Sequence, residues 1–126
     1  MAEYLFVYGT LKPEFAPPEL AGVMRQLKRV GSGRVRGFLY DLGEYPGVRL
    51  DAEGEEVRGE VFEFGDAAIL KELDRYEGYE VQNPGQSLFI RKQCQVRIEG
   101  KNLVCWVYEY NRQPAVSERI DTWPPK

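Results

Sequence analysis

The feature that most constrains the fold is a strand-like stretch, Val30–Leu42, that is repeatedly interrupted by glycine. Gly31, Gly33 and Gly37 lie there among valine and aromatic residues. Glycine weakens a straight strand, and inside a strand pattern it usually marks a bend or a β-bulge. We therefore expect a bent or bulged strand of the kind that forms the wall of a barrel.

Other stretches also have the composition or the alternation of β-strands. They are Glu3–Tyr8, Val57–Phe64, Ser87–Ile98 and Leu103–Tyr110. Toward the end of Val57–Phe64 apolar residues occupy both faces, as expected of a strand that contacts apolar groups on both sides. Tyr45-Pro46-Gly47 is expected to form a turn.

Two segments have the apolar spacing of a helix that packs one face on a core. The first begins at Pro18, a residue suited to a first helical turn, and its stripe is Leu20, Val23, Met24 and Leu27. The second follows Asp66, an expected N-cap, and its stripe is Ile69, Leu70, Leu73 and Tyr76. The fold class is therefore α+β, a small mixed or antiparallel β-barrel with two flanking helices, because closure removes exposed strand edges. The chain has 126 residues and no repeat or linker, so residues 1–126 are expected to form a single domain.

The two cysteines, Cys94 and Cys105, flank an expected hairpin with its turn at Glu99-Gly100-Lys101-Asn102. If Ile98 pairs with Leu103, the thiols lie diagonally on one face, with Cα atoms roughly 7–8 Å apart. That separation is too long for a comfortable disulfide. Both cysteines are therefore expected to be buried free thiols, which suits a reducing compartment.

The charge balance and the first residues limit the partners of the chain. With 17 basic and 20 acidic residues the net charge is −3. Nucleic acid is therefore not an expected partner, because its phosphates require a basic surface. Residues 1–8 have no basic segment, and their apolar run is too short for a signal or a membrane span. We expect a cytoplasmic protein without a membrane partner.

The chain contains no histidine, the side chain that most often acts as a general base near neutral pH and as a zinc ligand. Ser-His-Asp and Cys-His catalysis are therefore excluded. No Asp, Glu or Cys cluster has the spacing of metal ligands, so no metal site is expected. Any acid–base chemistry must come from a carboxylate, a lysine, a tyrosine or a thiol.

One candidate site is the loop after the first strand, Val7-Tyr8-Gly9-Thr10-Leu11-Lys12. A glycine at such a break lets backbone N–H groups approach a ligand, and successive N–H groups can bind an anion. The loop lacks the second glycine and the Lys-Ser/Thr ending of a P-loop. The alternative interpretation is a strand that simply ends at a glycine.

A second candidate is Glu77, within Leu73-Asp74-Arg75-Tyr76-Glu77-Gly78-Tyr79. Gly78 is expected just past the helix end, so Glu77 faces the negative end of the helix dipole, which opposes ionisation and raises its pKa. Tyr76 and Tyr79 are expected to add an apolar wall. Such a carboxylate suits a general base near neutral pH, and the alternative is a solvated glutamate.

Further short motifs follow one another in order along the chain. They are Tyr45-Pro46-Gly47, Val57-Arg58-Gly59-Glu60-Val61 ahead of the glutamate motif, and Phe89-Ile90-Arg91 and Trp106-Val107-Tyr108 after it. Together with the first loop and the glutamate motif, they make nearly the whole chain resemble the γ-glutamylcyclotransferase-like family. The closest resemblance is to its AIG2-like and γ-glutamylamine cyclotransferase branch.

This resemblance implies a compact barrel and a cofactor-free reaction on a small molecule. A γ-glutamyl amine or γ-glutamyl amino acid is cyclised to 5-oxoproline, because its own α-amine attacks the γ-carbonyl group and releases the amine. The catalytic glutamate of the family maps onto Glu77, which takes and returns the proton. The resemblance carries substrate-binding roles over to Tyr8, Gly9, Thr10, Leu11, Tyr45, Arg91 and Tyr108. A backbone N–H nest in the loop would either stabilise the developing oxyanion or anchor the α-carboxylate.

The chain departs from the family pattern at two places. After the first motif it has Pro13-Glu14-Phe15-Ala16-Pro17-Pro18, where many members have basic residues, glycine and an asparagine. Phe89 stands where tyrosine is frequent. Both departures concern the substrate more than the fold. Two alternatives stay open: a non-catalytic or differently specific barrel that binds a small metabolite, and a different acyl-transfer enzyme that uses the same glutamate.

Overall fold

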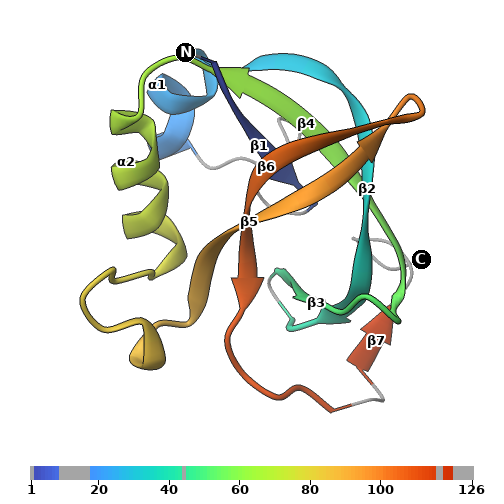
Figure 1. Ribbon diagram of the computed structural model, residues 1–126. Helices are drawn as coiled ribbons and strands as arrows, with labels where there is room; N and C mark the ends of the chain where they lie inside the picture. Colours follow the sequence, from blue (N-terminus) through green and yellow to red (C-terminus); the bar gives the residue numbers. More distant parts are fainter. Residues whose placement is uncertain (1, 9–17, 44, 116–117, 121–126) are drawn as a thin grey trace.

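The computed structural model describes residues 2–8, 18–43, 45–115 and 118–120. In chain order the elements are β1 (Glu3–Val7), the 3₁₀ turn η1 (Pro18–Leu20), α1 (Ala21–Met24), β2 (Lys28–Asp41), β3 (Pro46–Leu50), β4 (Glu55–Phe64), α2 (Ala68–Glu77), the 3₁₀ turn η2 (Pro84–Gln86), β5 (Phe89–Ile98), β6 (Lys101–Tyr110) and β7 (Arg119–Ile120). Figure 1 shows twisted strands that cross one another, with α1 and α2 on one side. In these described ranges no helix has the length and apolar character needed to cross a membrane.

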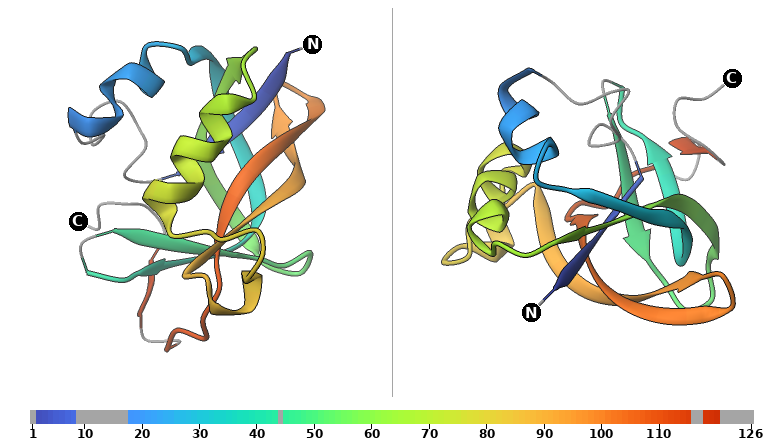
Figure 2. Two further views of the ribbon diagram at one scale, coloured as in Figure 1. Left: turned by 90° about the vertical axis from the view of Figure 1, so that its left-hand side faces the viewer. Right: turned by 90° about the horizontal axis from the view of Figure 1, so that it is seen from above.

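Five strands close into a barrel. β1 pairs with β4, β4 with β2, β2 with β5, β5 with β6, and β6 pairs back with β1. The β1–β6 pair is parallel, whereas the other four are antiparallel. β3 and β7 join the barrel by pairing with β2, and the view from above in Figure 2 places both helices outside the ring of strands. The expected α+β fold, a small mixed barrel with two flanking helices, is confirmed.

β2 is the strand that bends around the barrel. It is 14 residues long and pairs with β4 along residues 28–37, with β5 at Arg34, and with β3 along residues 37–41. The register with β4 shifts between Arg29 and Gly31, and this leaves Val30 out of the ladder, as in a β-bulge. The bent or bulged strand expected from its glycines is confirmed.

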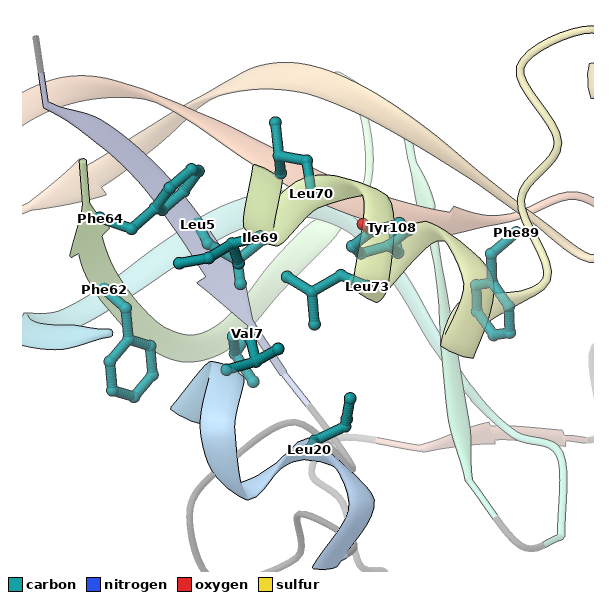
Figure 3. Close-up of a cluster of buried hydrophobic side chains, with 11 residues drawn as sticks. Leu5, Val7, Leu20, Phe62, Phe64, Ile69, Leu70, Leu73, Phe89 and Tyr108 are labelled. Carbon is teal, nitrogen blue, oxygen red and sulfur yellow. The ribbon is translucent and has the colours of Figure 1, made fainter. Parts of the chain in front are cut away.

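The buried apolar side chains form two cores, one on each side of the barrel wall. The inner core contains Phe6, Tyr8, Val35, Leu39, Val48, Val57, Val61, Val96, Ile98, Cys105 and Val107. The outer core lies between the wall and the helices (Figure 3) and contains Leu5, Val7, Leu20, Val23, Phe62, Phe64, Ile69, Leu70, Leu73, Phe89 and Tyr108. β1 and β4 contribute to both cores, which explains why Val57–Phe64 is apolar on both faces.

Two local elements differ from the expectations. α1 is a single turn, so Leu27 lies outside it; Gly22 within this turn has a low helix propensity. The turn expected at Tyr45-Pro46-Gly47 lies earlier in the chain, where Leu42 N–H donates to the carbonyl oxygen of Tyr45 over 3.0 Å. Pro46 instead begins β3, since the first residue of a strand is a position that tolerates proline.

The β5–β6 hairpin has a different register from the expected one. Ile98 pairs with Lys101, not with Leu103, and the turn is the pair Glu99-Gly100 with φ angles of 47° and 79°. Positive φ at both positions is typical of a two-residue hairpin turn. The diagonal arrangement of the thiols is therefore wrong, because Cys94 lies directly opposite Cys105. Both are free thiols; Cys105 is buried and Cys94 only partly buried.

Candidate active site

Glu77 is the last residue of α2, as expected. The helix ends there because Gly78 adopts the left-handed conformation, with φ of 73°. The N–H of Tyr79 then donates to the carbonyl oxygen of Asp74 over 2.8 Å, and the N–H of Gly78 donates to that of Arg75 over 3.4 Å. This pair of bonds is a Schellman cap. It holds Glu77 at a defined place where the helix meets the barrel.

The surroundings of Glu77 oppose its ionisation. Burial raises the pKa of Glu77 from 4.5 to about 8. The direction of this shift agrees with the expectation, although burial rather than the helix dipole is the cause that the structure identifies. Tyr76 is 38% exposed, so the prediction that its ring adds to an apolar wall is wrong. Tyr79, in contrast, packs against the outer core. Near neutral pH this carboxyl group is poised to accept and return a proton.

Tyr8 follows β1 and connects three parts of the barrel. Its hydroxyl group donates to the carbonyl oxygen of Tyr108 over 2.6 Å and accepts from the N–H of Val48 over 3.2 Å. Burial and the nearby charge of Glu77 raise the pKa of Tyr8 well above 10. Tyr8 is therefore a neutral phenol that lies close to Glu77 and ties β6 to β3.

Arg91 on β5 and Tyr108 on β6 both bond to Asp74 on α2. Arg91 donates from Nε to Oδ1 over 2.8 Å and from Nη2 to Oδ2 over 3.2 Å. The hydroxyl group of Tyr108 donates to the same Oδ1 over 2.8 Å. The guanidinium carbon of Arg91 also lies 4.5 Å from the ring centre of Trp106. The structure thus gathers two of the predicted site residues around one carboxylate, three residues before Glu77.

The other predicted site residues are placed as follows. Tyr45 is half-buried and packs against the outer core, with its ring centre 5.8 Å from that of Phe89. Gly9, Thr10 and Leu11 lie outside the described residues. Among the described candidates, Arg91 and Tyr108 therefore lie at α2 and Tyr8 bonds to Tyr108, whereas Tyr45 lies beside Phe89 on the outer core.

Sequence reasoning missed the role of Asp74, which was expected only to belong to the helix terminus. A signal for it exists in the helical spacing. Leu70, Leu73, Asp74 and Glu77 follow the i, i+3, i+4, i+7 pattern of a buried stripe. Both carboxylates thus occupy positions where the pattern demands apolar residues, and Asp74 is only 8% exposed. Acidic residues at such positions indicate a buried partner or a function.

A family model described as "Gamma-glutamyl cyclotransferase, AIG2-like" matches residues 5–124 of the chain. The chain belongs to this family. Among solved structures it is similar to an AIG2-like protein from Mus musculus, with 23% identity, coverage of 97% of this chain and 88% of that chain, and a TM-score of 0.74. It is also similar to YkqA from Bacillus subtilis, with 23% identity, 95% of this chain covered and a TM-score of 0.69. The chain spans 38% of the length of YkqA.

A protein described as "Gamma-glutamyl cyclotransferase" is similar to this AIG2-like family member at 17% identity, with 87% of this chain and 67% of that chain covered and a TM-score of 0.61. At these identities the solved structures establish the shared fold. No curated protein sequence matches the chain.

A wide groove of about 1650 Å³ lies elsewhere on this AIG2-like domain. It is lined by strand residues that include Arg34, Arg58 and Arg97, which lie opposite one another on adjacent strands. Of the predicted site residues that the structure describes, none lines this groove. Within the part of the chain that the structure describes, no group of three His, Cys, Asp or Glu side chains is placed to hold a metal ion. The candidate site is therefore the end of α2 that carries Asp74 and Glu77.

The raised pKa of Glu77 predicts a pH-dependent stability difference between this AIG2-like protein and its Glu77→Gln variant. From about pH 4.5 to 8 the unfolded chain has released a proton that folded Glu77 retains, so the folded state loses stability as the pH rises through this window. At about 1.4 kcal/mol per pKa unit, the pH-dependent gain in unfolding free energy of Glu77→Gln over the unchanged protein is at most about 4–5 kcal/mol at pH 8 and close to zero at pH 4. Urea unfolding of both proteins between pH 4 and pH 8 measures this difference in unfolding free energy.

The control for this prediction is Glu72→Gln, which makes the same chemical change on the exposed face of α2. Its unfolding free energy should run parallel to that of the unchanged protein at every pH. Parallel curves for Glu77→Gln as well would contradict a desolvated Glu77 with a raised pKa.

Proposed function

We propose that this protein is a γ-glutamyl cyclotransferase-type enzyme that converts a γ-glutamyl amine or γ-glutamyl amino acid to 5-oxoproline, with Glu77 as the general base and acid. The observation that carries the proposal is the half-buried carboxyl group of Glu77, whose pKa is raised by desolvation to about 8. It stands at the glycine-capped end of α2 near the neutral phenols Tyr8 and Tyr108. Family membership supports the same reaction class.

The reaction needs one proton carrier and no co-reactant. Ionised Glu77 takes a proton from the α-ammonium group of the substrate, and the free amine attacks the γ-carbonyl carbon. A C–N bond forms to close the five-membered ring, and the bond from that carbon to the leaving nitrogen breaks. Protonated Glu77 gives its proton to the leaving nitrogen, which lets that bond break. The carboxylate then takes the second proton from the ring nitrogen and passes it to the released amine. Because the attack is intramolecular, holding the substrate in a near-attack geometry lowers the barrier by several kcal/mol.

The remaining site residues stay predictions as substrate contacts. Gly9, Thr10 and Leu11 would bind the γ-glutamyl part through backbone N–H groups, and Tyr45 would supply an aromatic wall. Arg91 uses Nε and Nη2 to hold Asp74, so we assign a substrate contact to its Nη1 group. The tyrosine ring of Tyr8 would line the pocket, since its hydroxyl group is already bonded to the backbone of β3 and β6.

The proposal is tested by incubating the full-length protein with a panel of γ-glutamyl amines and γ-glutamyl amino acids and detecting 5-oxoproline by mass spectrometry. Release of 5-oxoproline and an equal amount of the amine from at least one compound is the expected result. Saturable binding of these compounds without any product would favour the non-catalytic barrel. Turnover of amides that lack a γ-glutamyl group would favour a different acyl-transfer enzyme.

The pH dependence of the rate follows from the pKa of Glu77. Only the ionised carboxylate can accept the proton of the α-ammonium group, and its pKa in the free protein is about 8. We therefore expect kcat/KM to rise about tenfold per pH unit below pH 8 and to level off above it. Initial rates between pH 5.5 and 9.5 measure this profile. A profile that is flat from pH 6 to 8 would show that Glu77 is not the base.

A further inference from the structure

We propose that Asp74 is a positioning residue that fixes the hydroxyl group of Tyr108 as a hydrogen-bond acceptor for the α-ammonium group of the substrate. This inference rests on the proposed function, because it assigns a second partner to the amine that Glu77 deprotonates. Its starting point is a buried carboxylate that the reaction itself does not use. Asp74 is 8% exposed, and each of its two side-chain oxygens accepts a hydrogen bond from Arg91.

The hydrogen bonds around Asp74 determine the direction of the Tyr108 hydroxyl group. An arginine side chain can only donate, and an ionised carboxylate can only accept. The 2.8 Å contact between Tyr108 and Oδ1 of Asp74 is therefore a bond in which the hydroxyl group donates. A phenol has a single proton. Once that proton points at Asp74, the Tyr108 oxygen can offer only its lone pairs to a ligand.

Glu77 follows Asp74 by three residues on α2, so both carboxyl groups lie on the same face of the helix, one turn apart. The hydroxyl group of Tyr108 bonds to the first of them. Burial, the hydrogen bond to Asp74 and the nearby charges of Asp74 and Glu77 together raise the pKa of Tyr108. The phenol therefore stays neutral, and Figure 3 shows its ring beneath α2, next to Leu73. When Glu77 is ionised, as the proposed reaction requires, Glu77 and Tyr108 present two oxygen acceptors at one end of the helix.

Two neighbouring acceptors select the kind of group that binds between them. A carboxylate has no proton to donate and would meet only acceptors, which is unfavourable. An ammonium group has three donors and a positive charge, so it complements both oxygens. The geometry therefore places the amine end of a γ-glutamyl substrate at α2. Tyr8 supports this arrangement, because it bonds to the backbone carbonyl group of Tyr108.

The first arm of the test is steady-state kinetics of four full-length proteins: the unchanged enzyme, Tyr108→Phe, Asp74→Asn and the double variant. Loss of a hydrogen bond to a charged group should raise KM about tenfold in each single variant, with a much smaller change in kcat. The double variant should be no worse than either single one, because Asp74 acts through Tyr108. If Asp74 only clamps α2 through Arg91, its effect persists in the Tyr108→Phe protein, and the KM effects multiply.

The second arm measures binding and needs no turnover. Its probes are γ-L-glutamyl methylamide and the analogue without the α-amino group, titrated calorimetrically into Glu77→Gln and into Glu77→Gln with Tyr108→Phe. The amine should improve affinity at least tenfold in the first protein, and this preference should shrink in the second. An unchanged preference overturns the inference, even if Asp74→Asn fails to fold. Absence of 5-oxoproline from the unchanged protein would instead reject the proposed function, while this arm still decides the role of Tyr108.

Discussion

Replacing Glu77 with glutamine is expected to lower 5-oxoproline release by about 10²–10⁴-fold, because the amide cannot carry a proton between the substrate amine and the leaving group. The fold should be kept, since glutamine has the same shape and removes a half-buried carboxyl group whose ionisation is unfavourable. Substrate affinity should change much less than kcat, because the contacts to the rest of the substrate remain. Single-turnover rates measured by mass spectrometry, with calorimetric binding of the same substrate, separate the two effects.

The matched control for the kinetic experiment is again Glu72→Gln, on the exposed face of the same helix. Its rate should equal that of the unchanged enzyme. A Glu77→Gln variant that keeps more than about a tenth of the rate would reject Glu77 as the general base. A variant that loses both activity and its folded circular dichroism spectrum would show that the residue is needed for the fold.

Replacing Gly59 with alanine is expected to destabilise the barrel strongly. Gly59 lies where β4 passes β1, and a Cβ atom there would press against the backbone carbonyl oxygen of Val7 and lie 2.6 Å from Cζ of Phe6. A backbone group cannot move aside as a flexible side chain can, so β1 and β4 must separate. We expect a loss of about 3 kcal/mol or more, at the upper end for overpacking of a core. Urea unfolding followed by tyrosine and tryptophan fluorescence measures this loss.

The same substitution should also lower activity, because β1 leads directly to Tyr8. Gly22→Ala is the control, since a Cβ atom at Gly22 would meet nothing within 4 Å and alanine is the better helix former. That variant should be unchanged or more stable by up to about 1 kcal/mol. Equal urea midpoints for Gly59→Ala and the unchanged protein would contradict the close approach of β1 to β4.

Local signals in the sequence were sufficient for most of the elements. Strand composition predicted β1, β2, β4, β5 and β6, which are the five strands of the barrel. Gly78 predicted the end of α2, because left-handed backbone conformation after a helix is a local property of glycine. The position of Glu77 followed from that helix end. The bend of β2 followed from glycines inside a strand pattern.

Local signals failed where two interpretations differ by a small shift along the chain. The predicted hairpin register differs from the observed one by two residues. Both a two-residue and a four-residue turn fit Glu99–Asn102, and both keep the same side chains on the inner face. β3 was missed because proline and glycine at its start are turn residues as well. Pairing with β2 on one side and β6 on the other makes this segment a strand.

By itself, the sequence determined the five strands of the barrel and the helix α2, the need for a base other than histidine, and Glu77 as the residue to test. Only the tertiary structure decided which side chains surround that residue. Asp74 meets Arg91 and Tyr108, which are 17 and 34 residues further along the chain, and no local pattern encodes a contact over that distance. The burial that raises the pKa of Glu77 likewise arises only when α2 packs on the barrel. The sequence sets the residue types, whereas the environment that these residues share forms only when the barrel closes.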